Sequence, residues 1–179
     1  MTVSPSPTTT PTTGLTTNQD LDPRLLRDAF GTFPSGVVAI AAEIDGRPVG
    51  LAASSFTSVS LDPPLVSVNL AVSSKTWPDL RRSSHLGVTV LADHHAAVCR
   101  ALAGPVDQRF DSIAWTATPD GAITLDDGLA SFDCTIYREV EAGDHVLVLL
   151  RLHALQQAED VANPLVFHNS GFGTLRTLA

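Results

Sequence analysis

The sequence predicts a mainly β fold, in which an antiparallel sheet closes into a barrel and carries only short helices. At least six or seven segments have the composition of strands, and most follow one another at hairpin-like spacing. The segments expected to be helical are short, and no glycine-rich dinucleotide turn follows the first strand. A parallel, doubly wound sheet is therefore not expected.

The composition fits one domain preceded by a tail. The chain has 179 residues, of which 44% are apolar, enough for one sizeable core. Residues 1–20 are rich in Thr, Ser and Pro and poor in core-forming residues, so we expect a disordered tail there. Residues 21–179 are expected to form the domain, and neither a signal peptide nor a membrane helix is expected.

The net charge limits the possible binding partners, and the cysteines indicate the cellular compartment. The formal net charge is -8 and Lys75 is the only lysine, which argues against electrostatic binding to nucleic acid or to an anionic membrane. Cys99 and Cys134 are far apart in sequence and have no metal-ligand spacing, so we interpret them as reduced core thiols of a cytoplasmic protein.

The first elements are expected to be a helix and a hairpin. Asp22 and Pro23 are typical of a helix start, and Gly31 is expected to end that helix. Two β-rich segments follow, residues 36–44 and 47–53, and the Asp-Gly pair between them is a strong hairpin signal.

The middle of the chain is expected to alternate strands with short helices. Residues 65–71 alternate apolar and polar side chains, with Ser67 and Asn69 on the polar face. We then expect a helix over 76–82 with Thr76 as its cap, a strand over 85–91, and a helix that runs from its cap Asp93 to Gly104.

The last third is expected to begin with loops and to end in strands. Residues 104–128 are expected to be loop-rich. Two long strands, 129–140 and 146–155, are expected around the turn 143–145, and residues 164–168 form a last short strand.

Residues 50–64 are the most informative segment for function, because small and hydroxyl-bearing residues are crowded between two apolar strands. Small side chains leave backbone N–H and C=O groups accessible, and hydroxyls add donors and acceptors. Asp62-Pro63-Pro64 is expected to impose an extended exit from the segment. This pattern suits a planar ligand that bears a phosphate. An edge strand followed by a Ser-rich loop explains it equally well.

Lys75 and Thr76 are candidates for holding a phosphate at the start of the short helix, by charge, hydroxyl and free N–H groups. The neighbouring Arg81 and Arg82 are equally consistent with a solvated face. Asp93-His94-His95 invites a metal hypothesis, but no third ligand has a recognisable spacing, and we expect no metal site.

His145 is a further candidate, because it lies in the tight turn Gly143-Asp144-His145 before a hydrophobic strand. Asp144 could fix the imidazole tautomer and leave the other ring nitrogen for a ligand. Alternatively, both side chains only satisfy backbone groups of the turn.

Taken together, the motifs resemble the flavin reductases with an FMN-binding split barrel, the small reductase components of two-component flavin monooxygenases. The resemblance extends from about Asp22 to Leu175. Its ordered motifs are Phe33-Pro34-Ser35-Gly36-Val37, Pro48-Val49-Gly50, the segment 54–65, Gly143-Asp144-His145 and Pro164-Leu165-Val166-Phe167.

This resemblance implies a homodimer of six-stranded antiparallel Greek-key split barrels with short flanking helices, in which flavin lies near the subunit interface. It implies flavin contacts from Pro48, Val49, Gly50, Leu51, Ala52, Ser54, Ser55, Asn69, Leu70, Ala71, Lys75 and Thr76. Lys75 and Thr76 would reach the phosphate, and His145 would lie on the nicotinamide side. Arg100 and Arg109 are both candidates for an additional phosphate contact.

The implied activity is NAD(P)H-dependent flavin reduction, a hydride transfer from NADH or NADPH to FMN or FAD that requires no essential acid or base. Reduced flavin would be supplied to a partner monooxygenase. Ala52 and Ser54 replace larger polar residues common in the family, which implies loosely held flavin. Two alternatives share the barrel: a non-catalytic FMN-binding protein, and an FMN-dependent oxidase of the pyridoxamine phosphate oxidase type.

Overall fold

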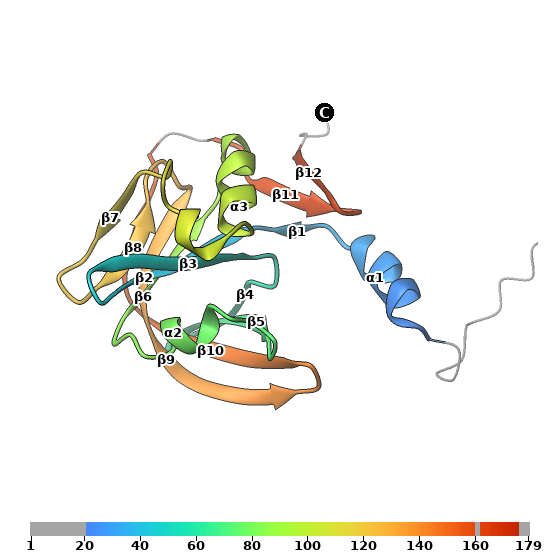
Figure 1. Cartoon of the computed structure of the whole chain (residues 1–179), viewed down its shortest axis with the longest axis horizontal. Coiled ribbons are helices and arrows are strands. Elements are labelled where there is room, and N and C mark those ends of the chain that lie inside the picture. Colours follow the sequence, from blue (N-terminus) through green and yellow to red (C-terminus); the bar gives the residue numbers. More distant parts are fainter. Residues whose placement is uncertain (1–20, 160–161, 176–179) are drawn as a thin grey trace, which may run out of the picture.

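The computed structural model describes residues 21–159 and 162–175, and it has the predicted mainly β architecture (Figure 1). The described strands form one sheet of nine strands and one of three, and every strand pair is antiparallel. The predicted disordered tail, residues 1–20, lies outside the described residues.

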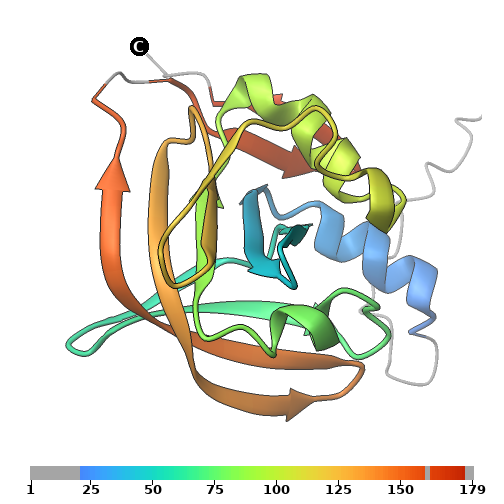
Figure 2. The ribbon, with the colours of Figure 1, turned by 60° about the vertical axis from the view of Figure 1, so that its left-hand side comes forward.

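The large sheet has the order β4-β5-β10-β9-β6-β2-β8-β7, with β3 on the other side of β2. It curves strongly (Figure 2), and β3 comes into contact with β5. Its strands are β2 (Val38–Ile44), β3 (Arg47–Ala53), β4 (Thr57–Leu61), β5 (Pro64–Ala71), β6 (Leu86–Val90), β7 (Trp115–Ala117), β8 (Ala122–Leu125), β9 (Ala130–Ala142) and β10 (His145–Gln157).

The predicted hairpin signal at Asp45-Gly46 is confirmed, because β2 and β3 pair in register from Ile44 and Arg47 to Val38 and Ala53. Asp45 and Gly46 both have positive φ, as this turn requires. Within the described residues β3 pairs only with β2, and no ladder joins it to β5. The closed barrel of six strands therefore stays a prediction.

The small sheet corrects one expected boundary. It contains β1 (Ser35–Gly36), β11 (Leu165–His168) and β12 (Gly171–Thr174), in the order β1-β11-β12. Gly36 was expected to start the strand that runs to residue 44, but it pairs with Val166 of β11 instead. The chain therefore changes sheets at Val37, next to the start of β2.

The helices are short, as predicted, but one expected cap is wrong, and another has the expected position without a capping side-chain bond. Helix α1 (Pro23–Gly31) is capped by Asp22, whose carboxylate accepts from the N–H groups of Arg24 and Leu25. The others are α2 (Trp77–Leu80), α3 (Ala96–Leu102) and the 3₁₀ turns η2 (Asp93–His95) and η3 (Val106–Gln108).

At α2 the side chain of Thr76 makes no capping bond, and Ser74 Oγ accepts from the Trp77 N–H instead. Asp93 begins η2 rather than capping α3, because one 3₁₀ turn precedes the α-helix.

Two regions contain strands that were not expected: residues 104–128 were expected to be loop-rich, and a Ser-rich loop was part of one interpretation of residues 50–64. The segment 104–128 contains the hairpin β7–β8, and residues 57–61 form β4, which pairs with β5. Both corrections have the same physical cause: the strands are short, and their pairing depends on neighbours that the local sequence does not reveal.

β2 separates two apolar cores and is buried on both faces. Val38, Ile40 and Ala42 pack into one core, whereas Ala39 and Ala41 pack into the other. This explains why the segment is a continuous apolar run. Both cysteines are free and buried, as predicted; burial raises the pKa of the Cys134 thiol to about 12 and also raises that of Cys99.

Candidate ligand site

A pocket of about 570 Å³ lies between the end of β3, the end of β5 and the segment that follows β5. Its volume is in the range usual for small-molecule sites. The pocket brings together nine of the predicted site residues, which lie on these separate stretches of chain. They are Leu51, Ala52, Ser54, Ser55, Asn69, Leu70, Ala71, Lys75 and Thr76.

The walls of this pocket carry mostly small side chains. Ala53 and Ser54 lie at the end of β3, Ala71 and Ser73 at the end of β5, and Ala103 after α3. Such residues leave a flat ligand free to approach the backbone closely, where N–H and C=O groups can bond its polar edge. The residues present therefore fit a planar ring system such as a flavin.

Ser55 joins the two sides of the pocket. Its Oγ donates to the carbonyl of Asn69 at 3.0 Å and accepts from the Asn69 N–H at 2.9 Å. The ladder between β4 and β5 extends only to Ser67, so Ser55 supplies the partner that β5 lacks at Asn69. Since its hydroxyl makes these two bonds, Ser55 positions the wall rather than offering a free group to a ligand.

Arg109 crosses the pocket from the segment that follows η3. Its Nη1 donates to the Gly50 carbonyl and to Thr76 Oγ1, both at 2.8 Å, and its Nε donates to the Gly104 carbonyl at 3.0 Å. Burial lowers the pKa of the guanidinium, which remains charged at neutral pH. Arg109 thus ties β3 to Thr76 at the start of α2.

Lys75 and Thr76 occupy the same end of the pocket as Arg109 but differ in exposure. Thr76 is only 4% exposed, whereas the Lys75 side chain is exposed. Two cations and the Thr76 hydroxyl therefore lie at this end of the pocket, a set of groups suited to a phosphate.

Three predicted flavin contacts lie outside this pocket. Pro48 and Val49 line an adjoining pocket of about 660 Å³ with Phe110 and Trp115, and Val106 lines both. Gly50 is buried between β2 and Phe110, and only its carbonyl is tied to the pocket, through Arg109. The three residues lie in the first part of β3, whereas the pocket is formed at the end of that strand.

His145 lies beside the pocket rather than in its lining. It pairs in register with Ala71, a lining residue, and its side chain is 44% exposed. Its Nδ1 lies 2.8 Å from Asp144 Oδ1, and this hydrogen bond, followed by the charge of His145, lowers the pKa of Asp144. The arrangement places a proton on Nδ1 and leaves Nε2 as an acceptor.

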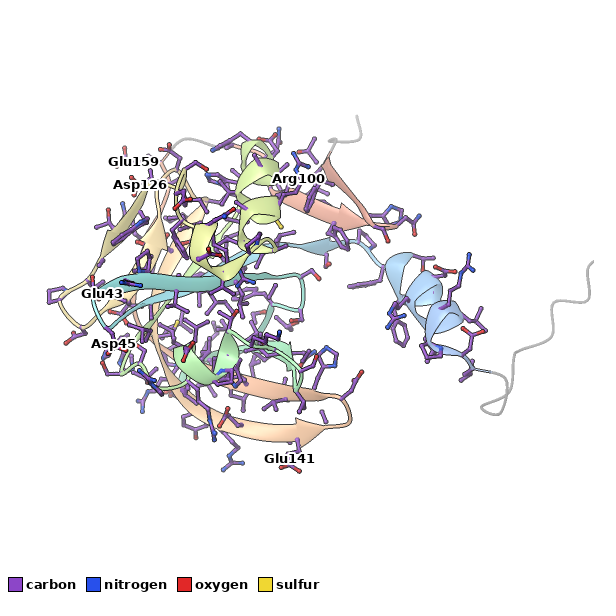
Figure 3. The ribbon with its side chains drawn as sticks, viewed as in Figure 1. Glu43, Asp45, Arg100, Asp126, Glu141 and Glu159 are labelled. Carbon is purple, nitrogen blue, oxygen red and sulfur yellow. The ribbon has the colours of Figure 1, made fainter. Side chains whose placement is uncertain are left out.

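A smaller apolar pocket of about 230 Å³ adjoins the first one through Ala52, Ala53, Ser54 and Ala103. Phe167 and Phe172 form part of its wall. Arg100 also lines it and lies over the Phe172 ring at 5.7 Å, between α3 and the small sheet (Figure 3). Of the two arginines considered from sequence, only Arg109 lines the pocket that contains Lys75 and Thr76.

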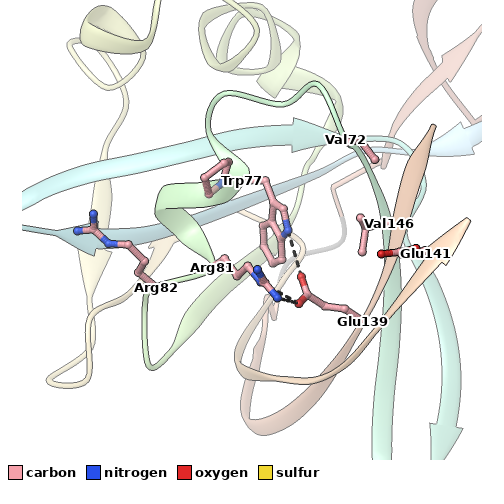
Figure 4. Close-up of a pocket in the computed structure, with 8 residues that line it drawn as sticks. Val72, Trp77, Arg81, Arg82, Glu139, Glu141 and Val146 are labelled. Atoms are coloured by element: carbon pink, nitrogen blue, oxygen red, sulfur yellow. Dashed lines mark hydrogen bonds and ion pairs between the residues drawn. The ribbon is translucent and has the colours of Figure 1, made fainter. Parts of the chain in front are cut away.

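A pocket of about 820 Å³ lies beside α2 and is lined by Val72, Val146, Trp77 and charged side chains. Glu139 accepts from Trp77 Nε1 at 3.2 Å and from Arg81 Nε at 2.8 Å (Figure 4). Arg82 pairs with Asp45. Because both arginines have carboxylate partners, this geometry favours the solvated-face interpretation of the pair.

The metal hypothesis for Asp93-His94-His95 finds no geometric support. His95 is buried and its Nδ1 accepts from the Ala92 N–H at 3.2 Å, while His94 lies against it. Within residues 21–159 and 162–175 no three His, Cys, Asp or Glu side chains are grouped to hold a metal ion. In the same part of the chain, no helix has the length and apolar character required to cross a membrane.

A family model described as "Flavin reductase like domain" matches residues 30–176. A probable flavin reductase of Rhizobium meliloti is 38% identical over 161 residues. That alignment covers 89% of this chain but only 51% of the relative, so the chain spans about half the relative's length.

Two solved structures share the fold. The flavin reductase component BorF of a bacterial two-component tryptophan halogenase is 33% identical, with a TM-score of 0.79 over 88% of this chain and 100% of that one. The NADH:FAD oxidoreductase SgcE6 of Streptomyces globisporus, in complex with NAD and FAD fragments, is 29% identical, with a TM-score of 0.81 over 93% of this chain and 97% of that one.

Proposed function

The chain belongs to the family of flavin reductase like domains, and from this we propose that it catalyses NAD(P)H-dependent reduction of FMN or FAD. One observation carries the proposal: nine predicted flavin-contact residues line a single pocket whose small walls and paired cations suit a planar ring with a phosphate. Bound flavin supplies the hydride acceptor, and NADH or NADPH supplies the donor.

The protein contributes binding and orientation. The ends of β3 and β5 would hold the ring against small side chains, and backbone N–H groups near residues 50–55 would stabilise negative charge on its polar edge. Lys75, Thr76 and the residues around them hold the phosphate end. No side chain serves as an essential acid or base, because holding two rings in contact is the main requirement.

His145 orients the nicotinamide. It lies beside Ala71, at the margin of the pocket, and would be close to the nicotinamide ring if NADH or NADPH bound next to the flavin. The Asp144 bond fixes the imidazole so that Nε2 can accept from the carboxamide of the nicotinamide. His145→Ala should therefore raise the KM for the nicotinamide and leave the flavin Kd unchanged.

The proposal includes assembly and partners. Residues 21–179 form one domain, in which β5, β10, β9, β6, β2 and β3 make a split barrel. The domain forms a homodimer and passes reduced flavin to a partner monooxygenase. The family membership and the reductase component BorF, whose partner is a halogenase, support this arrangement.

An anaerobic assay tests the proposal. When NADH or NADPH is added to the protein and FMN or FAD, the visible absorbance of the flavin should be lost catalytically. Ser54→Trp should abolish this loss, because Ser54 is an exposed residue of the pocket wall and indole fills the space for the ring. Ser58→Trp is the matched control, since Ser58 is also exposed but lies on β4, outside the wall. Unchanged absorbance with every pairing of flavin and nicotinamide would reject the function.

The assay also separates the two alternatives. A non-catalytic flavin-binding protein would bind FMN without turnover. An oxidase of the pyridoxamine phosphate oxidase type would need cations for a second phosphate besides that of FMN. Among the described residues, Lys75 and Arg109 are the only cationic side chains that line the pocket.

A further inference from the structure

Two histidines and an aspartate lie together on the outer face of the large sheet. His85 directly precedes β6, Asp133 lies on β9, and His153 lies in the second half of β10. Leu86 and Cys134, which follow His85 and Asp133, are paired in register and buried in the core. Because side chains alternate along a strand, His85 and Asp133 point away from that core. None of the three residues lines the candidate flavin pocket.

Each of the two imidazole rings has one nitrogen held by a neighbouring oxygen atom. Asp133 Oδ1 accepts from His85 Nδ1, because a carboxylate has no proton to donate. His153 Nε2 lies 2.8 Å from Thr135 Oγ1. Within residues 21–159 and 162–175 the other ring nitrogens, His85 Nε2 and His153 Nδ1, have no hydrogen-bond partner. A histidine that binds a metal ion has this arrangement, in which its second nitrogen is held by an oxygen atom.

The spacing of the two rings suits chelation of a single ion. Their centroids are 5.5 Å apart and their planes are inclined by 42°. Imidazole nitrogens bind Zn²⁺ at about 2.0–2.1 Å, so two rings on one tetrahedral ion have centroids roughly 5 Å apart. Small rotations of the two side chains would therefore bring both free nitrogens onto one ion, without movement of the strands.

The sheet and the carboxylate both favour binding of a cation here. β9 pairs with β6 on one side and with β10 on the other, so the strands fix the relative positions of the side chains. His85 and Asp133 are only 23% and 15% exposed, which limits the side-chain freedom that an ion would have to remove. The negative charge of Asp133 offsets that of Arg151, an exposed residue opposite Thr135.

We propose that His85 and His153 form a binding site for a divalent transition-metal ion such as Zn²⁺. His85 Nε2 and His153 Nδ1 are the protein ligands, water fills the remaining positions, and Asp133 and Thr135 orient the rings. Two protein ligands are fewer than structural zinc sites have, so the ion is held less tightly than in those sites. The inference is independent of the proposed function. Sequence spacing predicted no such site, because His85 and Asp133 lie 48 positions apart.

Calorimetric titration of the full chain, without an affinity tag, with Zn²⁺ tests the proposal. The wild type should bind the ion saturably. His153→Asn should raise the Kd by at least about 10- to 100-fold, the loss that removal of even an outer-shell partner of a metal ligand causes. Zn²⁺ should also raise the Tm of the wild type, because the ion joins β6 to β10 in the folded chain only, and should not raise that of the variant.

His85→Asn provides a second route and should weaken binding to a similar extent. His153 is exposed, so its replacement should not disturb folding if that of the less exposed His85 does. His94→Asn is the matched control. His94 also lies against a second histidine, with ring centroids 4.1 Å apart, but Nδ1 of that residue, His95, accepts from a backbone N–H. His94→Asn should therefore leave the Kd unchanged.

Three outcomes would overturn the proposal: no saturable binding of Zn²⁺ to the wild type, an unchanged Kd in a folded His85 or His153 variant, or an equal loss in His94→Asn. Flavin reduction is not measured in this experiment. Failure of the metal site would therefore leave the proposed function untouched, and a protein that did not reduce flavin could still bind the ion.

Discussion

At the residue scale, the Ser55 hydroxyl supplies the two hydrogen bonds that a neighbouring strand would otherwise make to Asn69. Ser55→Ala would remove two hydrogen bonds to Asn69 and leave the edge of β5 to water. We expect the free energy of unfolding to fall by about 1 kcal/mol, because Asn69 is exposed and water replaces part of the loss. Urea denaturation measures this change, and flavin binding should weaken with it.

Ser54→Ala is the matched control for this loss of stability. Ser54 precedes Ser55, and its side chain is exposed. Removal of the Ser54 hydroxyl should change the free energy of unfolding by less than about 0.5 kcal/mol. Equal losses in the two variants would contradict the bridging role of Ser55.

His95 gives stability a pH dependence whose sign follows from burial. Its pKa lies below 6.5, first because burial disfavours the charged ring and second because His94 is adjacent. The unfolded chain therefore takes up a proton more readily than the folded one. Stability is unaffected above the unfolded pKa of 6.5 and falls as the pH drops below it.

The measurement compares Tm at about pH 7.5 and at about pH 5.5 for the wild type and for His95→Asn. Asn can accept from the Ala92 N–H as His95 does, but it does not titrate. The fall in Tm should be smaller in the variant, because carboxylates elsewhere affect both proteins alike. Equal falls would show that His95 contributes nothing to acid sensitivity.

At the element scale, the position of Gly50 in β3 follows from contacts across the sheet. A Cβ there would lie 2.7 Å from Phe110 Cζ and 2.9 Å from both Ala41 Cβ and the Ile40 carbonyl. We expect Gly50→Ala to lower the free energy of unfolding by about 1–3 kcal/mol through overpacking. It should also weaken flavin binding, because β3 must move away from Arg109.

Gly36→Ala is the control, since no atom lies within 4 Å of the added Cβ at that position in β1. Chemical denaturation should separate the two variants clearly. If the two variants were equally stable, the prediction that β3 packs too tightly on Phe110 to accept a Cβ at residue 50 would be wrong.

The elements that sequence predicted well have strong local signals. The Asp45-Gly46 turn and the Asp22 cap each depend on a few adjacent residues, and both are confirmed. The β7–β8 hairpin was missed, although Pro119-Asp120-Gly121 is a turn signal, because its strands span only three and four residues. Strands this short form through tertiary pairing, here of β8 with β2.

The candidate site also contains residues that the local sequence predicts and residues that it does not. The small residues of β3 and β5 were recognisable because they interrupt apolar strands. The role of Arg109 was not, because its partners Gly50 and Thr76 lie 59 and 33 positions away in sequence. No local pattern distinguishes Arg109 from Arg100; only the fold brings one of them to the pocket.

At the scale of the whole molecule, α1 has an apolar face that the rest of the described chain does not cover. Helix α1 has no buried residue, and it projects from the sheets (Figure 1). Phe30 and the nearby Phe33 are 70% and 76% exposed. Exposed aromatic side chains at this density are typical of an interface, and the proposed homodimer would bury them against a second copy.

Phe30→Ser combined with Phe33→Ser should therefore convert a dimer into a monomer at micromolar concentration, because the apolar contacts that offset the cost of association are lost. Light scattering coupled to size-exclusion chromatography measures the mass directly. Leu155→Ser on β10, at a side chain that is 68% exposed, is a matched control and should leave the mass unchanged. A wild-type monomer, or a double variant with the wild-type mass, would exclude α1 as the dimer contact. If flavin binding also weakens in the monomer, the second copy contributes to the flavin site, as expected for a pocket near the subunit interface.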